Sequence, residues 1–379
     1  MRILLSVHHH LSGDAGAPGV TLRLADQYRE AGNQVTVTSF EELPRWTPER
    51  GVQVLYPWFV AATVTRRARS FDVIDASSGD TWLLGALPSR TLPVVVVRSH
   101  GLEHMAHLER LDEAKRGDLK LSWRYPLYHG GWRLREVAWS LRHADLALFL
   151  NTGDRDYAVD QLGVRRDRTA IVDNGLPSAL LGLPRPGPHE IPHVAVIGSF
   201  ITRKGIRHLV PALTRLMEVH RPLRAGFFGV GMPPSAVLDR FPAELRSRIE
   251  VVERYSNGAL PTLLRDYSIQ LLPSLSEGFV LAALEGMACG LALITTTRSG
   301  IAERLVDGED ALLIAPGSAE AIADAVERLL VDGPLLAQIR QAGYAKSQHF
   351  GWTRIAQETL TLYREALERK RARRLARWP

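Results

Sequence analysis

The segment "SLSEGFVLAALEGMACG" (274–290) carries two glutamates, Glu277 and Glu285, with the apolar run "GFVLAAL" between them. The preceding "IQLLPS" (269–274) is typical of a buried strand, and the apolar run predicts a helix that begins after "SEG". Glu277 is then expected near the helix N-terminus and Glu285 about 12 Å further along the axis. Carboxylates so far apart cannot share one proton or one metal ion, but they suit the two ends of an extended ligand.

The start of this helix is a predicted anion site. The backbone N–H groups of Gly278, Phe279 and Val280 are expected to face the middle of the ligand, which suits a group such as pyrophosphate. A carboxylate accepts hydrogen bonds from vicinal hydroxyls, so a sugar at one end and a ribose at the other fit chemically. The alternative is a chance pair of glutamates, one of them a solvated residue of the first helical turn.

Apolar strands alternate with amphipathic helices on both sides of this segment, which implies parallel sheets covered on both faces. The proline- and glycine-rich "PSALLGLPRPGPHEIP" (177–192) is the best linker candidate. The sequence therefore predicts an α/β protein of two doubly wound, Rossmann-like domains with the ligand cleft between them. The expected domains are 1–182 and 183–351, with a C-terminal helix (352–379) that joins the first.

Composition narrows the class of protein. The 379 residues are 45% hydrophobic and 23% charged, as in globular proteins, and the apolar runs are too short to cross a bilayer. The single Cys289 rules out an intramolecular disulfide and favours a cytoplasmic protein. Residues 364–379 carry +5 of the net charge of +6, so the body gives no case for binding nucleic acid. The basic tail favours either a solvated helix end or peripheral contact with the inner face of an anionic membrane.

The two-glutamate segment also carries a resemblance. "SEGFVLAALEGMACGLALITT" and the following "SGIAERLVDGEDALLIAPG" resemble the donor-site segment of family 4 glycosyltransferases, which have the GT-B fold. The resemblance covers about 190–350 and is thinner over 1–180, where "SHG" (99–101) and "DNGL" (173–176) match best. It implies a retaining, metal-independent transferase that moves a sugar from a nucleotide-diphospho-sugar to an acceptor hydroxyl, with no further cofactor. By the same resemblance, Glu277 contacts the donor sugar and Glu285 the ribose.

A second stretch, "IGSFITRKG" (197–205), is similar to the phosphate-binding loop of that family. Lys204 fits the family lysine, whereas Ser199 stands where the family usually has arginine. Arg203 is a candidate replacement, although neighbouring side chains are expected to point in different directions. Val280 is a further departure, because family members often have glycine there.

The first half supplies the expected acceptor side. "HLSGDAGAPGV" (10–20) is a glycine-rich connection with Gly13, Gly16 and Gly19. The resemblance implies that such a loop closes over the reacting sugar and diphosphate, with Gly16 the preferred contact; a plain flexible turn is the alternative. His100 ends the strand "LPVVVVRSH", and the matching family histidine lies close to the anomeric carbon of the donor. The catalytic candidates are thus His100, Lys204 and Glu277.

Other histidines and aromatic residues are weaker candidates. His100, His104 and His107 have helical spacing, but no fourth ligand completes a zinc site, so no metal is predicted. One or two residues of His8–His10 are expected to line the cleft. The segment "LSWRYPLYHGGWRLREVAWSLRH" (121–143) suits either a platform for an acceptor or an amphipathic helix packed on the sheet. The acceptor contacts proposed from it and from the histidines are His104, Trp123 and Arg124, for a sugar, lipid or small-metabolite acceptor.

Two other functions remain open at this stage. One is a nucleotide-sugar epimerase or a phosphorylase on the same scaffold. The other is a catalytically silent protein that binds nucleotide, which the departure at Ser199 keeps in view. Fold alone does not decide between these functions.

Overall fold

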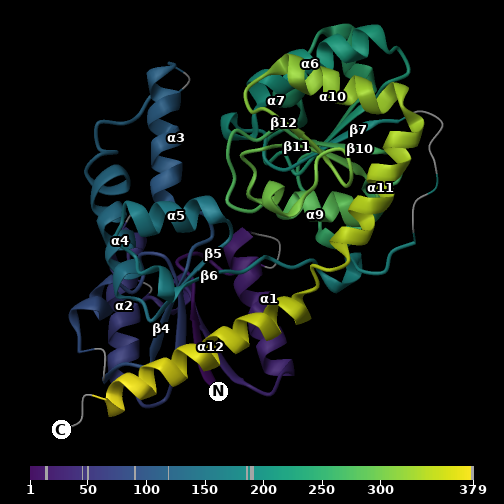
Figure 1. Ribbon diagram of the computed structural model, residues 1–379. Coiled ribbons are helices and arrows are strands. Elements are labelled where there is room, and N and C mark those ends of the chain that lie inside the picture. Colours follow the sequence, from purple (N-terminus) through teal and green to yellow (C-terminus); the bar gives the residue numbers. More distant parts are fainter. Residues whose placement is uncertain are drawn as a thin grey trace. The chain divides into compact units, whose positions relative to one another are not determined.

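The computed structural model describes residues 1–12, 16–44, 46–48, 51–88, 91–117, 119–184, 187 and 192–376. Contacts divide the chain into two compact units: unit 1 (Met1–Asn174 with Trp352–Pro379) and unit 2 (Gly175–Gly351). Each unit contains its own six-stranded parallel sheet with helices around it (Figure 1). The predicted fold class, two doubly wound α/β domains, is confirmed. The division by contacts falls at 174/175, a little before the predicted 182/183.

Unit 1 is built on a sheet with strand order β2-β1-β3-β4-β5-β6. Its strands are β1 (Arg2–Ser6), β2 (Gln34–Thr38), β3 (Val73–Ser77), β4 (Val94–Arg98), β5 (Leu146–Phe149) and β6 (Thr169–Ile171). Its helices are α1 (Gly16–Glu30), α2 (Val52–Arg66), α3 (Glu103–Lys115), α4 (Arg133–His143), α5 (Thr152–Asp160) and α12 (Trp352–Leu375). Strand β1 pairs with β2 on one side and with β3 on the other. The chain therefore crosses to the opposite side of β1 after β2, and the winding reverses between β1 and β3.

Helix α12 belongs to unit 1 although unit 2 precedes it in the sequence. Figure 1 shows it, in yellow, lying along α1. Its Tyr363 is fully buried and donates a hydrogen bond to Asp75, which also accepts 3.0 and 2.7 Å hydrogen bonds from Arg98. Because the buried carboxylate and guanidinium are paired, α12 covers the sheet without leaving an uncompensated charge inside.

Unit 2 has the strand order β12-β11-β10-β7-β8-β9, and its winding reverses between β7 and β10. Its strands are β7 (Val194–Ile197), β8 (Ala225–Phe228), β9 (Ile249–Val252), β10 (Ile269–Leu272), β11 (Ala292–Thr296) and β12 (Leu312–Ile314). Its helices are α6 (Ile206–Val219), α7 (Pro234–Leu238), α8 (Leu260–Leu263), α9 (Leu281–Ala288), α10 (Ala319–Val331) and α11 (Gly333–Ser347).

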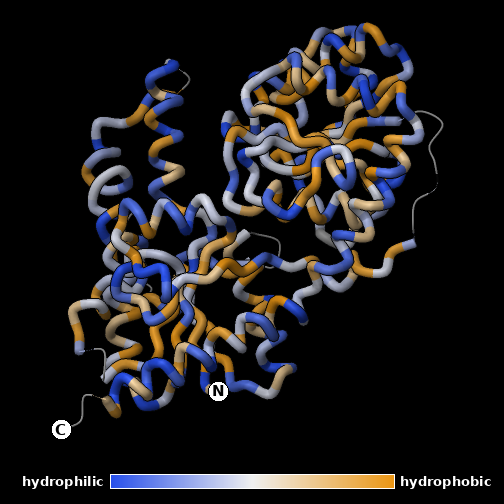
Figure 2. The backbone as a smooth tube through the Cα atoms, in the orientation of Figure 1, coloured by the Kyte–Doolittle hydropathy of each residue, from blue (hydrophilic) through white to orange (hydrophobic). Residues whose placement is uncertain are grey.

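The inner strands are largely apolar and buried because helices cover both sides of each sheet. β7, β10 and β11 are buried along their whole length, and Figure 2 shows the hydrophobic residues gathered inside each unit. Helix α6 buries Leu209, Leu213 and Leu216 at the spacing of one helical face. Among the described helices, none combines the length and the apolar character that a membrane span needs.

Candidate functional site

The phosphate-loop candidate of unit 2 follows β7 at the point where the winding of the sheet reverses. Residues Thr202–Lys204 form a 3-10 turn that ends at Gly205, whose φ is +75°. A Cβ atom at Gly205 would lie 2.1 Å from the Pro273 carbonyl oxygen, so only glycine fits there. The Leu275 N–H donates to the Arg203 carbonyl at 2.9 Å. These contacts hold the loop after β7 against the loop after β10.

This packing brings the two predicted donor-site segments together. Lys204 Nζ lies 2.7 Å from Glu277 Oε1, and Arg203 Nη1 lies 2.9 Å from Glu277 Oε2. The Glu277 side chain is 10% exposed, whereas that of Arg203 is 43% exposed. The expectation that Arg203 and Lys204 point in different directions is wrong, because the 3-10 turn lets both reach the same carboxylate. Two cations thus face one anion at the carboxyl edge of the sheet.

The backbone of Glu277 is held in an extended conformation. It forms a β-bridge with Ser299, and the Gly300 N–H donates to the Glu277 carbonyl at 2.9 Å. A Cβ atom at Gly300 would lie 1.8 Å from the Gly278 carbonyl oxygen, so the loop after β11 needs glycine at this contact. The prediction of a helix after "SEG" is confirmed, with Phe279 and Val280 lying between Gly278 and the first residue of the helix. Helix α9 begins at Leu281, after this bridged segment.

The later helix start changes the expected anion contacts. Gly278, Phe279 and Val280 precede α9 instead of forming its first turn, and the side chains of Phe279 and Val280 are buried. Glu285 lies inside α9. Burial of the Cys289 thiol, together with the nearby Glu285 charge, raises the pKa of Cys289 to about 12. Ser199 is half-buried just after β7 and before the turn that carries Lys204.

Unit 1 has a second cluster of polar residues at the carboxyl ends of β1, β3 and β4. His8 Nδ1 lies 2.9 Å from Asp80 Oδ1, and the Asp80 side chain is completely buried. Arg133 Nη2 donates to the Ser78 carbonyl at 2.7 Å and lies 3.4 Å from both ring nitrogens of His8. Gly79 has a φ of +87°, and a Cβ atom there would lie 2.5 Å from the Arg133 guanidinium. Glycine at this position therefore lets the guanidinium pack on the backbone.

Three carboxylates surround this single arginine. Arg133 Nη2 lies 3.7 Å from Asp80 and 3.8 Å from Glu103, and its Nη1 lies 3.4 Å from Glu136. Ser78 Oγ donates to Glu103 at 2.8 Å. Burial raises the pKa values of Glu103 and Glu136 although the Arg133 charge opposes it. The cluster therefore offers carboxylate oxygens and an arginine in a largely dry environment, which suits hydrogen bonds to hydroxyl groups.

Two histidines beside this cluster stay neutral at ordinary pH. The surrounding protein partly desolvates both rings, which lowers the pKa of His9 to about 4 and that of His100 to about 3, and in both cases nearby positive charge acts in the same direction. His100 lies after β4 and before α3, at the carboxyl edge of the sheet as predicted. A neutral imidazole both donates and accepts a hydrogen bond, so these rings can bind uncharged hydroxyls.

Other predicted acceptor-side residues lie in different surroundings. Gly16 is the first residue of α1 and Gly19 lies inside α1, so the glycine-rich connection ends earlier than the spacing of its glycines suggested. Gly13 falls outside the described residues. His104 is 8% exposed and packs against Tyr157, and burial lowers its pKa to about 4. That burial argues against a direct acceptor contact for His104.

The aromatic segment 121–143 divides into two parts. Its second part is α4, which buries Val137 and Leu141, as expected for an amphipathic helix. Its first part lines a cavity of about 500 Å³ together with α3. Arg124 contributes to that cavity and stacks over the 74%-exposed Trp123 at 5.1 Å, and Arg110 and Tyr125 add a cation and an aromatic face.

Sequence reasoning missed most of the unit 1 cluster. Asp80, Glu103, Arg133 and Glu136 were not among the candidates, although the "SGD" (78–80) that ends in Asp80 directly follows the buried strand β3. Polar residues at the carboxyl end of a parallel strand are a usable signal. Within the described ranges, no group of three or more histidine, cysteine or acidic side chains is arranged to hold a metal ion.

Comparison with known proteins places both units among sugar-transfer proteins. A protein-family model described as "Glycosyl transferase 4-like domain" matches residues 7–175, and one described as "Glycosyl transferases group 1" matches residues 191–332. A glycogen synthase of Mycobacterium tuberculosis is 28% identical over 251 residues, which cover 62% of this chain and 59% of the relative. A D-inositol 3-phosphate glycosyltransferase of Kribbella flavida is 30% identical over 190 residues, which cover 46% of this chain and 44% of the relative. The match therefore spans less than two thirds of the length of these relatives.

Solved structures share the fold over nearly the whole chain. A sucrose-phosphate synthase from Thermosynechococcus elongatus aligns with a TM-score of 0.76 and 20% identity, covering 96% of this chain and 99% of that one. Anabaena Alr3699/HepE, solved in complex with UDP-glucose, aligns with a TM-score of 0.68 and 18% identity, covering 95% and 99%. At these identities the likeness establishes the fold alone.

Proposed function

Because the chain belongs to family 4 of the GT-B-fold glycosyltransferases, we propose that it is a retaining glycosyltransferase. It moves a sugar from a nucleotide-diphospho-sugar to an acceptor hydroxyl and needs neither a bound metal nor a further cofactor. The observation that carries this proposal is the meeting of Arg203, Lys204 and Glu277 at the reversal of the unit 2 sheet. Ligands of open α/β sheets bind at such points.

The charges of this site suit a sugar diphosphate. Lys204 and Arg203 together exceed the charge of Glu277 by one, so the site has an unmatched positive charge. A diphosphate brings at least two negative charges and draws the two cations toward its oxygens. Glu277, once released from them, accepts hydrogen bonds from hydroxyls of the donor sugar, and Glu285 from the ribose. Arg203 supplies the guanidinium absent at Ser199.

The reaction follows from where charge develops. As the bond between the anomeric carbon and the phosphate oxygen breaks, negative charge grows on the leaving diphosphate, where Lys204 and Arg203 stabilise it. The acceptor hydroxyl attacks on the face that the leaving group vacates, and its proton passes to the leaving phosphate. His100, neutral at ordinary pH, orients the donor sugar by hydrogen bonding. Configuration at the anomeric carbon is retained.

The unit 1 cluster supplies the acceptor side of the proposal. His8, Glu103 and the neutral His9 present hydrogen-bonding groups at the carboxyl edge of the sheet. Arg133 and Asp80 hold the His8 ring in place. An uncharged polyhydroxyl group, as in a sugar or another polyol acceptor, satisfies this set better than an anion does, because carboxylates outnumber the arginine.

The proposal is tested by a thermal-shift panel with UDP, GDP, ADP, dTDP and their sugars. Ligands that bind only the folded state raise its Tm. We expect nucleotides with one nucleobase to raise Tm selectively and Glu285→Ala to weaken that rise. Glu277→Ala should weaken the Tm rise caused by the nucleotide sugar more than the rise caused by the nucleotide alone. Glu309→Ala, at an exposed glutamate of unit 2, is the matched control. No shift with any nucleotide would contradict the proposal, as would an inverted anomeric configuration in the product.

A further inference from the structure

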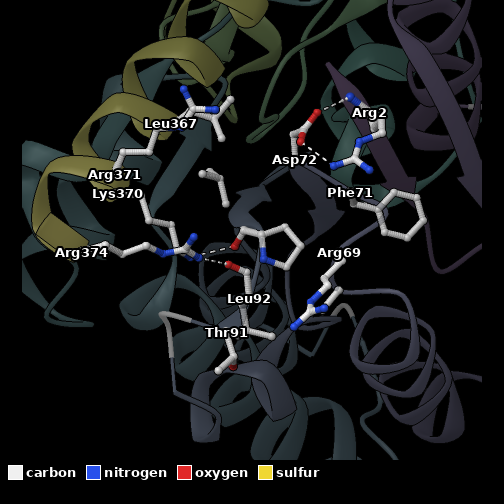
Figure 3. A pocket seen from close by; sticks show the side chains of 13 residues that line it. Arg2, Arg69, Phe71, Asp72, Thr91, Leu92, Leu367, Lys370, Arg371 and Arg374 are labelled. Atoms are coloured by element: carbon white, nitrogen blue, oxygen red, sulfur yellow. Dashed lines mark hydrogen bonds and ion pairs between the residues drawn. The ribbon is translucent and has the colours of Figure 1, made fainter.

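A basic cavity opens at the opposite edge of the unit 1 sheet from the acceptor cluster. It has a volume of about 550 Å³ and lies where β1, β3 and β4 begin, beside the end of α12 (Figure 3). The strands are about 15 Å long, so this cavity is well separated from the groups at their carboxyl ends. Five cationic side chains line it: Arg2, Arg69, Lys370, Arg371 and Arg374.

Two of the five cations are already neutralised. Arg2 Nη2 lies 2.9 Å from Asp72, which also lines the cavity. Lys370 is buried, with its Nζ 2.5 Å from Asp145 and 2.7 Å from the Pro93 carbonyl oxygen. These pairs fix the floor of the cavity and contribute no net charge to it.

The other three cations have no carboxylate partner in the described part of the chain. Arg374 donates one hydrogen bond, to the Leu92 carbonyl at 2.8 Å. No hydrogen bond or ion pair of the Arg69 or Arg371 side chain exists among the described residues. Figure 3 shows Arg69 and Arg374 on opposite sides of the Thr91–Leu92 backbone. Three guanidinium groups around one concavity repel one another, and a multiply charged anion would relieve that repulsion.

We propose that this cavity binds a phosphate group. Guanidinium groups match phosphate oxygens with paired, charge-assisted hydrogen bonds, and three of them suit a doubly charged phosphate. The apolar walls formed by Phe71, Leu92 and Leu367 reduce screening by water and strengthen the attraction. The phosphate belongs either to a soluble phosphate ester or to the headgroup of an anionic lipid. This phosphate site is separate from the proposed donor site in unit 2, where Lys204 and Arg203 bind the diphosphate.

The test removes the three unneutralised charges. The variant Arg69→Gln/Arg371→Gln/Arg374→Gln is compared with Arg221→Gln/Arg240→Gln/Arg254→Gln, which removes three exposed arginines of unit 2. Both are made in a Lys204→Ala background, so that the donor site contributes little phosphate binding. Calorimetry with inorganic phosphate and glycerol 1-phosphate forms one arm. Co-sedimentation with vesicles of phosphatidylcholine, with and without phosphatidylglycerol, forms the other.

We expect the cavity variant to bind at least about tenfold more weakly than the unit 2 control in one of the two arms. Binding in the calorimetric arm identifies a soluble ester, and binding only to vesicles that contain phosphatidylglycerol identifies a lipid headgroup. The double variant Arg69→Gln/Arg371→Gln keeps the Arg374–Leu92 hydrogen bond and excludes loss of folding as the cause. No binding in either arm, or equal binding by the cavity and control variants, would overturn the proposal.

Discussion

The two candidate clusters occupy equivalent places in similar sheets but have opposite charge balance. In unit 2, two cations face one carboxylate at the reversal between β7 and β10, and Arg203 is 43% exposed. In unit 1, one arginine faces three carboxylates beside the reversal between β1 and β3, with the Asp80 side chain fully buried. One architecture thus carries two clusters of opposite charge balance, one suited to an anion and the other to hydroxyl groups, and the loops after the strands determine the difference.

The same difference separates function from stability. A partly exposed cation such as Arg203 contributes little to the free energy of unfolding, because water solvates it when its partner is lost. A buried cation among carboxylates is required for the fold, because removing it leaves uncompensated buried charges. Variants of Arg203 and Lys204 should therefore affect activity, and variants of Arg133 should affect the free energy of unfolding.

The largest expected effect is on folding, in Arg133→Met. Loss of this guanidinium leaves Asp80, Glu103 and Glu136 without their cation and should lower the free energy of unfolding by about 3–5 kcal/mol. Urea unfolding of unit 1, followed by tryptophan fluorescence, measures it. The neighbouring exposed Arg135→Met is the control and should have little effect. If Arg133→Met were as stable as the control, the cluster would not depend on its single cation.

The next effect is on turnover, in Lys204→Ala. Removing a group that stabilises charge on the leaving diphosphate should lower kcat about 100- to 1000-fold while Tm changes little. Arg203→Ala should cost about tenfold, since that side chain is more exposed. Lys115→Ala, at a 76%-exposed lysine of α3, controls for loss of a surface charge. A larger loss in Arg203→Ala than in Lys204→Ala would reverse the assigned order of the two cations.

The smallest effect concerns pH. Folding holds the pKa of His100 at about 3, so below about pH 6.5 the unfolded chain binds a proton that the folded chain does not. Stability is therefore lost as the pH falls. Between about pH 6.5 and 4.5 the parent should lose about 2 kcal/mol more than His100→Asn. Urea midpoints at the two pH values test this, with the exposed His10→Asn as a control for loss of one imidazole. Parallel losses in the parent and His100→Asn would contradict the burial of His100.

The fold and the two segments that meet at Lys204 and Glu277 were largely predictable from the sequence, because their signals are local. Continuous apolar strands, a glycine at the end of a phosphate loop and a lysine beside it all lie within short windows. The bridged segment before α9 was not predicted, because the backbone pairing at Glu277 involves Ser299, which lies in another loop. The sequence of residues 274–290 contains no pattern that predicts the pairing of Glu277 with Ser299.

The unit 1 cluster was harder to predict because no short segment contains it. His8 follows β1, Asp80 follows β3 and Arg133 begins α4. Their contact also needs Gly79 to admit the guanidinium. Arg133 lies in the aromatic segment 121–143, but two of its three charge partners, Asp80 and Glu103, lie far away in the chain. Helix α2 was likewise not among the predicted helices, since its buried face is short and contains a proline.

The placement of α12 has a consequence for the order of events during synthesis. The ribosome completes residues 1–174 and then the whole of unit 2 before Trp352–Leu375 emerges. Until then Asp75 lacks the Tyr363 hydroxyl and Asp145 lacks the Lys370 ammonium. Unit 2 can fold as its chain emerges, whereas unit 1 waits for its last helix. The unit whose translation starts first is therefore finished last, and in that interval its sheet lacks the cover of α12.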